Sequence, residues 1–251
     1  MASQALIAGL SWRAIDFISD LHLQASEPAT FQAWQSYMQT TPADALFILG
    51  DLFEVWVGDD VLKEHGFEHR CSQVIQQTAA RVPTFFMHGN RDFLVGSDMM
   101  AACNAKLLAD PAVLNFKHQR WVLSHGDALC LDDTAYMAFR QQVRSTEWQQ
   151  AFLVKPLAER QAIARGLRQQ SEARKKTGAE YADVCPQAAR QLLLDANAST
   201  LIHGHTHKPA THDLGNGLQR VVLSDWDATA TPPRTEVLRL TAGGLQRIQL
   251  V

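Results

Sequence analysis

The chain has 251 residues, of which 46% are apolar and 20% charged, and its formal net charge is −3. These values are typical of a folded, single-domain protein that buries a large core without disulfides or structural metals. The slightly acidic balance argues against a surface built for nucleic acid, so we expect no nucleic-acid partner. The sequence lacks both an 18-residue apolar run and the features of a secretory signal, which predicts a cytoplasmic location.

Five short apolar runs are rich in Ile, Leu, Val and Phe and predict buried strands at residues 14–18, 45–49, 84–87, 121–123 and 200–202. Helical stretches at 31–38 and 74–80 separate the first three, which predicts parallel pairing in an α/β sheet. Later runs at 221–223, 236–240 and 245–250 predict a second sheet that closes the core.

The interval between the fourth and fifth runs is about 40 residues longer than a normal crossover. Apolar residues recur there at mostly three- to six-residue steps, which predicts a helical cap at about 133–183, inserted into one domain of residues 1–251. Seven Lys or Arg residues and two acidic residues lie between Lys155 and Lys176. This excess is either a solvated helix face or a surface for phosphates and anionic lipid headgroups.

A polar cluster follows each of the first five runs. The clusters are Asp20-Leu21-His22, Gly50-Asp51, Gly89-Asn90-Arg91-Asp92, His125-Gly126-Asp127 and Gly204-His205-Thr206-His207. Because ligands of open α/β sheets bind at the carboxyl ends of the strands, we expect one convergent site.

The donors at these strand ends are carboxylate, amide and imidazole groups: Asp20, His22, Asp51, Asn90, His125, His205 and His207. Seven donors exceed the needs of one tetrahedral zinc but suit two ions that share a ligand, for which Asp51 is the best bridge. The donor types favour two Mn²⁺ ions, with Fe, Co or Zn as substitutes.

Each fragment alone has an ordinary structural explanation, since a strand-end Asp is often a helix N-cap and a lone His is usually hydrogen-bonded in the fold. We expect such structural roles for six other histidines: His65, His69, His88, His118, His203 and His212. Asp92 and Asp127 are expected to orient the loops that carry the donors. The ordered occurrence of all five clusters after strands favours a metal site over coincidence.

In this order the five clusters resemble the calcineurin-like metallophosphoesterase superfamily, which implies a two-sheet β-sandwich flanked by helices and a dinuclear metal centre. Further segments extend the resemblance to the UDP-2,3-diacylglucosamine pyrophosphohydrolase family of lipid A biosynthesis over nearly the whole chain. These segments are residues 17–23, 53–60, 88–96 and 125–133, with Tyr136, Phe139-Arg140, Pro156-Leu157 and Asp225-Trp226.

The resemblance implies metal ligands and substrate contacts by position. One ion would be held by Asp20, His22, Asp51 and His207, and the other by Asp51, Asn90, His125 and His205. Substrate contacts would come from Asn90, Arg91, Asp133, Ser171 and His205. The chain departs from the family where an asparagine and a lysine are expected, at Lys175 and Gly178, so Lys175 or Lys176 would take the phosphate-binding role.

The implied reaction is hydrolysis of the pyrophosphate bond of UDP-2,3-diacylglucosamine to 2,3-diacylglucosamine 1-phosphate (lipid X) and UMP. A metal-bound hydroxide would attack the uridine-side phosphorus, with Asp51, Asn90, Arg91 and His125 as catalytic residues. Arg91 has an alternative role in a salt bridge to Asp92 or a neighbouring acidic residue. The implied setting is the cytoplasmic face of the inner membrane, bound peripherally, with no obligate protein partner.

Apolar residues of the cap could line an acyl groove or pack in the core: Phe139, Trp148, Phe152, Leu153, Leu157 and Ile163. Two other functions remain open. One is a metallophosphoesterase of broader specificity for nucleotides or other diphosphates. The metal ligands would be the same for this function, so only the cap separates it from the lipid-specific one. The other is a non-catalytic scaffold of the same fold, which would require lost donors, whereas all seven are present.

Overall fold

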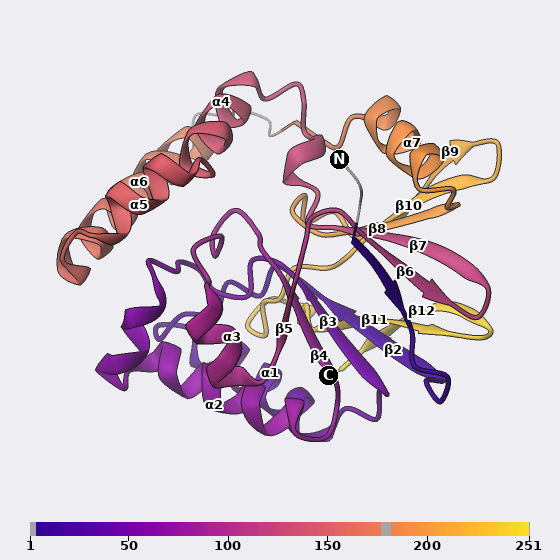
Figure 1. Cartoon of the computed structure of the whole chain (residues 1–251), viewed down its shortest axis with the longest axis horizontal. Helices are drawn as coiled ribbons and strands as arrows, with labels where there is room; N and C mark the ends of the chain where they lie inside the picture. Colours follow the sequence, from indigo (N-terminus) through magenta and orange to yellow (C-terminus); the bar gives the residue numbers. More distant parts are fainter. Residues whose placement is uncertain (1–3, 177–181, 251) are drawn as a thin grey trace.

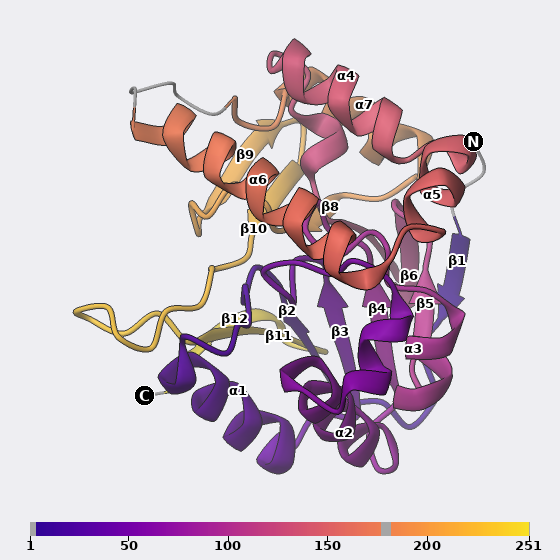
Figure 2. The same cartoon turned by 90° about the vertical axis from the view of Figure 1, so that its left-hand side faces the viewer.

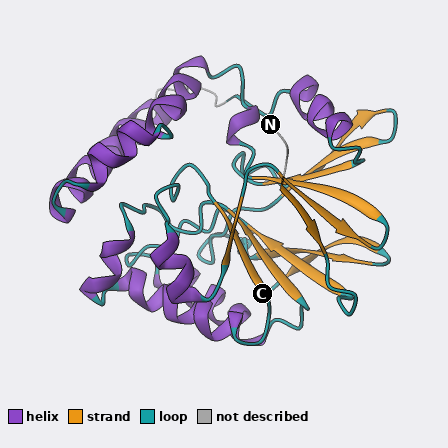
Figure 3. Cartoon of the chain, in the orientation of Figure 1, coloured by secondary structure: helices purple, strands orange, loops and turns teal. Residues whose placement is uncertain are grey.

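Two six-stranded sheets packed face to face form the centre of the described structure (Figures 1 and 3). It is a computed structural model that describes residues 4–176 and 182–250, with side chains for 4–169 and 182–250. The first sheet has the order β12 (Gly244–Gln249), β11 (Glu236–Thr241), β2 (Ala14–Ile18), β3 (Ala45–Leu49), β4 (Thr84–Met87), β5 (Lys106–Leu108). The second has the order β1 (Gln4–Ile7), β6 (Ala112–Phe116), β7 (Gln119–Ser124), β8 (Thr200–His203), β10 (Leu218–Val222), β9 (Thr211–Gly215).

The five predicted strands form, but they divide between the two sheets. β2, β3 and β4 pair in parallel in the first sheet, whereas β7 and β8 pair in parallel in the second. The predicted parallel pairing of the first three strands is therefore confirmed, whereas the expected composition of the second sheet is wrong. β10 joins β8, whereas the hairpin of β11 and β12 extends the first sheet beside β2.

Alternating side chains of the parallel strands explain their continuous apolar runs, because both sheet faces are covered. Phe17, Phe47 and Phe85 point between the sheets, with ring centroids 5.3 Å and 4.6 Å apart for successive pairs. Ile18 and Ile48 lie in the other core layer, under α1 (Pro28–Thr40), α2 (Phe67–Ala79) and α3 (Ser97–Cys103). The helix α7 (Pro186–Asp195) covers the outer face of the second sheet.

Three helices fill the stretch between β7 and β8 that the sequence assigns to a cap: α4 (Thr134–Val143), α5 (Thr146–Leu153) and α6 (Leu157–Lys176). They lie apart from α1–α3, and in Figure 2 α6 crosses above the carboxyl ends of β2, β3 and β4. Arg160 of α6 is buried and its guanidinium contacts Val57 O and Asp60, two groups of the loop that follows β3. In the described residues we find no helix with the length and apolar content needed to cross a bilayer.

Candidate metal centre

The seven predicted donors are brought together because the strands that precede them end at the same edge of the sandwich. Backbone hydrogen bonds connect the loops, from Asp20 N to Gly50 O (3.1 Å) and from His22 N to Asp51 O (3.0 Å). Five of the donors have φ values between 48° and 69°, in the left-handed region: Asp20, His22, Asp51, His205 and His207. Such strain in non-glycine residues clusters at functional sites, where the surrounding structure holds it in place.

Asp20, His22 and His207 form the first donor group, with one ligand atom of each within 4.8 Å of the others. The Nε2 atoms of His22 and His207 are 3.2 Å apart, and His207 Nε2 is 3.3 Å from Asp20 Oδ1. Asp20 Oδ2 accepts hydrogen bonds from Ser19 Oγ (2.6 Å) and His205 N (2.9 Å). Asp20 Oδ1 is buried without a hydrogen-bond partner, which is a suitable environment for a metal ligand.

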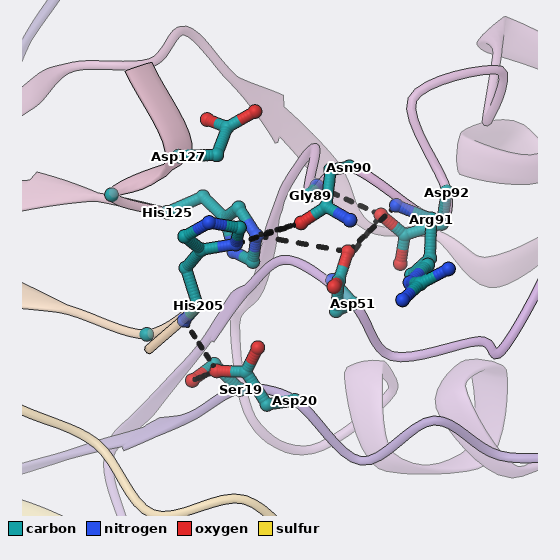
Figure 4. Close-up of polar contacts among 12 residues, drawn as sticks. Ser19, Asp20, Asp51, Gly89, Asn90, Arg91, Asp92, His125, Asp127 and His205 are labelled. Carbon is teal, nitrogen blue, oxygen red and sulfur yellow. Dashed lines mark hydrogen bonds and ion pairs between the residues drawn. The ribbon is translucent and has the colours of Figure 1, made fainter. Parts of the chain in front are cut away.

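The second group gathers around Asn90, whose Oδ1 lies 3.0 Å from His125 Nε2 and 2.9 Å from His205 Nδ1 (Figure 4). His125 Nδ1 donates to Leu49 O (2.9 Å), which leaves Nε2 as the ligand atom. Asp51 Oδ1 lies 3.7 Å from His125 Nε2 and accepts a hydrogen bond from Arg91 N (2.8 Å). The amide, imidazole and carboxylate groups therefore converge as a divalent cation requires.

The two donor groups meet at Asp20, because its carboxylate also lies within 4.8 Å of the ligand atoms of Asp51 and His125. Asp51 belongs to this second trio but not to the trio that contains His22 and His207. The bridging role of Asp51 therefore stays a prediction, whereas the central position of Asp20 was not foreseen.

Glycine is required at two positions of these loops because the donors approach the backbone closely. A Cβ atom on Gly89 would lie 2.1 Å from Asp51 Oδ1, and one on Gly204 would lie 2.2 Å from Asp20 Oδ2. Both distances are far below van der Waals contact, so any side chain there would displace a donor carboxylate.

Burial and the charges of neighbouring residues shift the pKa values of several donors. Burial alone would lower the pKa of His125, but the charges of Asp51, Asp20 and Asp127 raise it to about 9. Burial and the neighbouring charge of His125 lower the pKa of His205 to about 4. Burial opposes ionisation of Asp20, yet the hydrogen bond and charge of His207 hold its pKa below the usual range. These shifts favour the metal-binding forms of Asp20 and His205, an anionic carboxylate and an uncharged imidazole, whereas His125 must lose a proton when a cation binds.

Two buried carboxylates behind the donors organise the loops, as predicted. Asp92 accepts hydrogen bonds from Gly89 N and Leu52 N, both at 2.8 Å, and no ion pair joins it to Arg91 within the described residues. The alternative salt bridge between Arg91 and Asp92 is therefore wrong, whereas a pairing of Arg91 with another neighbouring acidic residue stays a prediction. Burial and the charge of Asp51 raise the pKa of Asp92 to about 7.

Asp127 lies beyond His125, with its carboxylate directed away from the donors (Figure 4). Its Oδ2 accepts hydrogen bonds from Tyr136 Oη (2.6 Å) and Arg140 Nε (2.8 Å), two residues of the cap helix α4. Burial opposes ionisation, but the charges of His125 and Arg140 keep the pKa of Asp127 below its usual range. Asp127 therefore connects the cap helix α4 to the loop that carries the donor His125.

Two histidines outside the site make the structural contacts expected of them. His88 Nε2 donates to Val95 O (2.6 Å), and His203 Nδ1 donates to Gly204 O (2.8 Å). His203 Nε2 lies 3.3 Å from Arg220, away from the donor groups.

A cavity of about 590 Å³ lies between the donors and the cap, and Asp51, Asn90 and His205 line it. Arg91 and Asp133 line it too, although Asp133 is also the N-cap of α4 and accepts from Tyr136 N (2.9 Å). Ser171, Lys175 and Lys176 lie outside the residues whose side chains are described, so their contacts with substrate stay predictions.

The apolar cap residues serve both of the expected uses. Phe139, Trp148 and Phe152 line the cavity, and the last two rings stack with centroids 4.7 Å apart. Leu157 and Ile163 do not line the cavity but pack against the buried core cluster to which Phe152 belongs and against which Trp148 also packs. Leu153 is 42% exposed and lines neither.

The basic excess of α6 is partly neutralised by acidic partners. Lys155 pairs with Glu159 (2.5 Å), Arg160 with Asp60 and Arg168 with Glu54. These three cations are therefore paired within the protein, and the choice between a solvated face and a surface for anionic groups stays a prediction.

Sequence reasoning missed two carboxylates that face the outer nitrogens of donor histidines. Glu54 Oε2 is 3.2 Å from His22 Nδ1, and Asp225 Oδ2 is 4.0 Å from His207 Nδ1. For Glu54 the available signal was its place shortly after the donor Asp51, since metal-binding histidines usually face a carboxylate or carbonyl through the second nitrogen; no comparable signal pointed to Asp225.

A helix-flanked double sheet with histidine, carboxylate and amide donors at its edge defines a metallophosphoesterase. The family model described as calcineurin-like phosphoesterase matches residues 14–209, and the chain belongs to this family.

Three relatives bear the name UDP-2,3-diacylglucosamine hydrolase. The protein of Chromobacterium violaceum is 46% identical over 94% of this chain and 99% of its own length. The protein of Ralstonia nicotianae is 44% identical over 91% of this chain and 90% of its own length. The protein of Bordetella pertussis is 40% identical over 93% of this chain and 93% of its own length. A solved archaeal phosphodiesterase is similar with a TM-score of 0.46 and 12% identity, over 94% of this chain and 98% of that one.

Proposed function

We propose that the protein hydrolyses the pyrophosphate bond of UDP-2,3-diacylglucosamine, releasing UMP and 2,3-diacylglucosamine 1-phosphate. The names of relatives at 40–46% identity over nearly the whole chain support this substrate. A diphosphate requires cationic and hydrogen-bonding groups, whereas two acyl chains require an apolar compartment.

The observation that carries the proposal is that one cavity contains both environments. Donor residues such as Asp51 and Asn90 line one side, and the cap residues Phe139, Trp148 and Phe152 line the other. A phosphoesterase for small soluble diesters has no use for such an apolar wall beside its metal centre.

Asp20, His22, Asp51 and His207 would hold one divalent cation, and Asp51, Asn90, His125 and His205 the other, with Mn²⁺ as the best fit to the donor types. When bound, such cations supply Lewis acidity and lower the pKa of a coordinated water.

Arg91 is the cationic side chain best placed to stabilise the reacting phosphates. Its backbone N–H is fixed on Asp51 (2.8 Å) and its side chain lines the cavity next to Asn90. A guanidinium in this position can donate to charge that accumulates on phosphate oxygens in the transition state. Asn90, Asp133 and His205 would orient the substrate from the same wall.

The substrate's acyl chains suggest that the enzyme works at the cytoplasmic surface of the inner membrane. Leu153 and Val154 directly follow Phe152 of the cavity wall and are 42% and 83% exposed. Exposed apolar residues beside Lys155 fit a peripheral contact with anionic lipid.

The test of the proposed function compares UMP release from UDP-2,3-diacylglucosamine with hydrolysis of its unacylated parent and of a simple phosphodiester. We expect kcat/KM to be highest, by at least about 100-fold, for the diacylated substrate, because only this substrate fills the apolar wall. Comparable values for all three would contradict the lipid-specific function and favour a broad phosphoesterase.

A further inference from the structure

Glu54 lies beside the metal-binding histidine of the β2 loop because two loop segments run side by side. Leu23 forms an isolated parallel bridge with Phe53, and Glu54 N donates to Leu23 O (3.2 Å). The backbone therefore holds the Glu54 side chain next to His22.

One oxygen of Glu54 faces the metal centre. Oε2 is 3.2 Å from His22 Nδ1, while the opposite nitrogen of the ring, Nε2, points into the donor group with His207 and Asp20. An anionic carboxylate this close to Nδ1 favours the histidine tautomer in which Nδ1 carries the proton and Nε2 is free to bind a metal.

The other oxygen of Glu54 faces the cap. Oε1 forms an ion pair with Arg168, which lies on α6 and lines the cavity. Both side chains are mostly shielded from solvent, with 16% of Glu54 and 20% of Arg168 exposed. An ion pair in such surroundings is less screened than a surface pair.

We infer that Glu54 is a positioning residue that couples the placement of the cap helix α6 to cation binding at His22. This inference rests on the proposed metal centre. Coupling between two equilibria is reciprocal, so the cap contact should strengthen cation binding and a bound cation should hold α6 more firmly.

A second ion pair between cap and body provides a matched control. Arg160 of the same helix pairs with Asp60, which touches none of the seven donors. Asp60→Asn therefore removes an ion pair of the same helix but leaves the contacts among Arg168, Glu54 and His22 in place, whereas Arg168→Gln removes the contact that passes through Glu54.

The experiment measures Mn²⁺ binding to the chelator-stripped full chain by titration calorimetry, with circular dichroism as a check on folding. We expect Glu54→Gln to weaken one Mn²⁺ site about 10- to 100-fold, as the loss of such outer partners does elsewhere. Arg168→Gln should weaken the same site less, and the double variant should equal Glu54→Gln because Arg168 acts through Glu54. Asp60→Asn should bind Mn²⁺ like the unaltered protein.

Unchanged Mn²⁺ affinity in Glu54→Gln, or equal losses in Asp60→Asn and Arg168→Gln, would overturn the coupling while leaving the proposed function intact. Failure of the unaltered protein to bind Mn²⁺ would contradict the proposed function as well. If Glu54→Gln does not fold, hydrogen exchange decides: Mn²⁺ should slow exchange in α6 of the unaltered protein and do so less in Arg168→Gln. Equal protection in both would overturn the inference.

Discussion

The hydroxyl of Tyr136 donates a 2.6 Å hydrogen bond to Asp127 Oδ2, and the Tyr136 ring also stacks on His205 with centroids 5.9 Å apart. One cap residue thus contacts the anchoring carboxylate through its hydroxyl and a predicted metal ligand through its ring. Arg140 of the same helix and Arg144, which directly follows that helix, are 2.8 Å and 3.7 Å from Asp127.

Tyr136→Phe removes the hydroxyl but keeps the ring over His205. We expect the free energy of unfolding to fall by about 1–2 kcal/mol, because a hydrogen bond to a charged acceptor is lost while two arginines still pair with Asp127. Urea denaturation of the metal-free protein measures this change. Unaltered stability would show that the arginines alone anchor the cap.

Gly89→Ala should disable the metal centre, since its Cβ would lie 2.1 Å from Asp51 Oδ1 and 2.3 Å from Asp51 N. We expect activity to fall by at least about 100-fold, as small misplacements of reacting groups cause losses of this size. Metal content, measured on the purified variant, should fall as well.

Gly166→Ala is the control for this substitution, because a Cβ at that position of α6 meets no atom within 4 Å. The added methyl group should leave activity unchanged and stabilise the helix by about 1 kcal/mol. Equal activity losses in both alanine variants would contradict the steric argument.

Asp51→Ala and Arg91→Ala should separate metal binding from transition-state stabilisation. Asp51→Ala should abolish turnover together with metal binding, because the Asp51 carboxylate is itself one of the predicted metal ligands. Arg91→Ala should lower kcat by about 100- to 1000-fold with metal content intact, as expected for a lost charge-stabilising donor. A metal-loaded, fully active Asp51→Ala protein is the outcome that excludes the predicted role.

Stability should depend on Asp183 near pH 4. Burial opposes its ionisation, but hydrogen bonds from Arg220 lower its pKa below the usual 3.8. Because the folded-state pKa is the lower one, Asp183 stabilises the fold above about pH 4 and loses this contribution as the pH falls. Asp183→Asn should therefore be less stable than the unaltered protein at pH 7, with the gap closing in acid. Thermal unfolding with chelator across this range measures the gap, and a gap that widens in acid would refute the sign.

The sequence predicts the strands that carry the donors because each is a short apolar run buried on both faces. β1 and β6 were missed, since β1 has only four residues and Asn115 interrupts the apolar run of β6, so that both strands depend on long-range pairing. Two sheets were predicted, but the sheet to which each later strand belongs was not, because the apolar runs are alike and only long-range contacts decide which strands pair.

The sequence was sufficient to predict which residues form the site, but not the distances between their ligand atoms. Donors such as Asp20, Asn90 and His205 could be predicted because they follow apolar strands in the sequence. The central position of Asp20 could not, because it depends on how the loops are placed relative to one another. Glu54 was missed because its role arises from contact with His22 and Arg168, which lie far from it in the chain.

The most direct test is a crystal structure of the protein soaked in Mn²⁺, with anomalous diffraction recorded at the manganese edge. Two peaks should appear about 3.5–4 Å apart, one on Asp20, His22 and His207 and one on Asn90, His125 and His205. Peaks elsewhere, or no peak at these donors in a protein that cleaves UDP-2,3-diacylglucosamine, would contradict a paired metal centre.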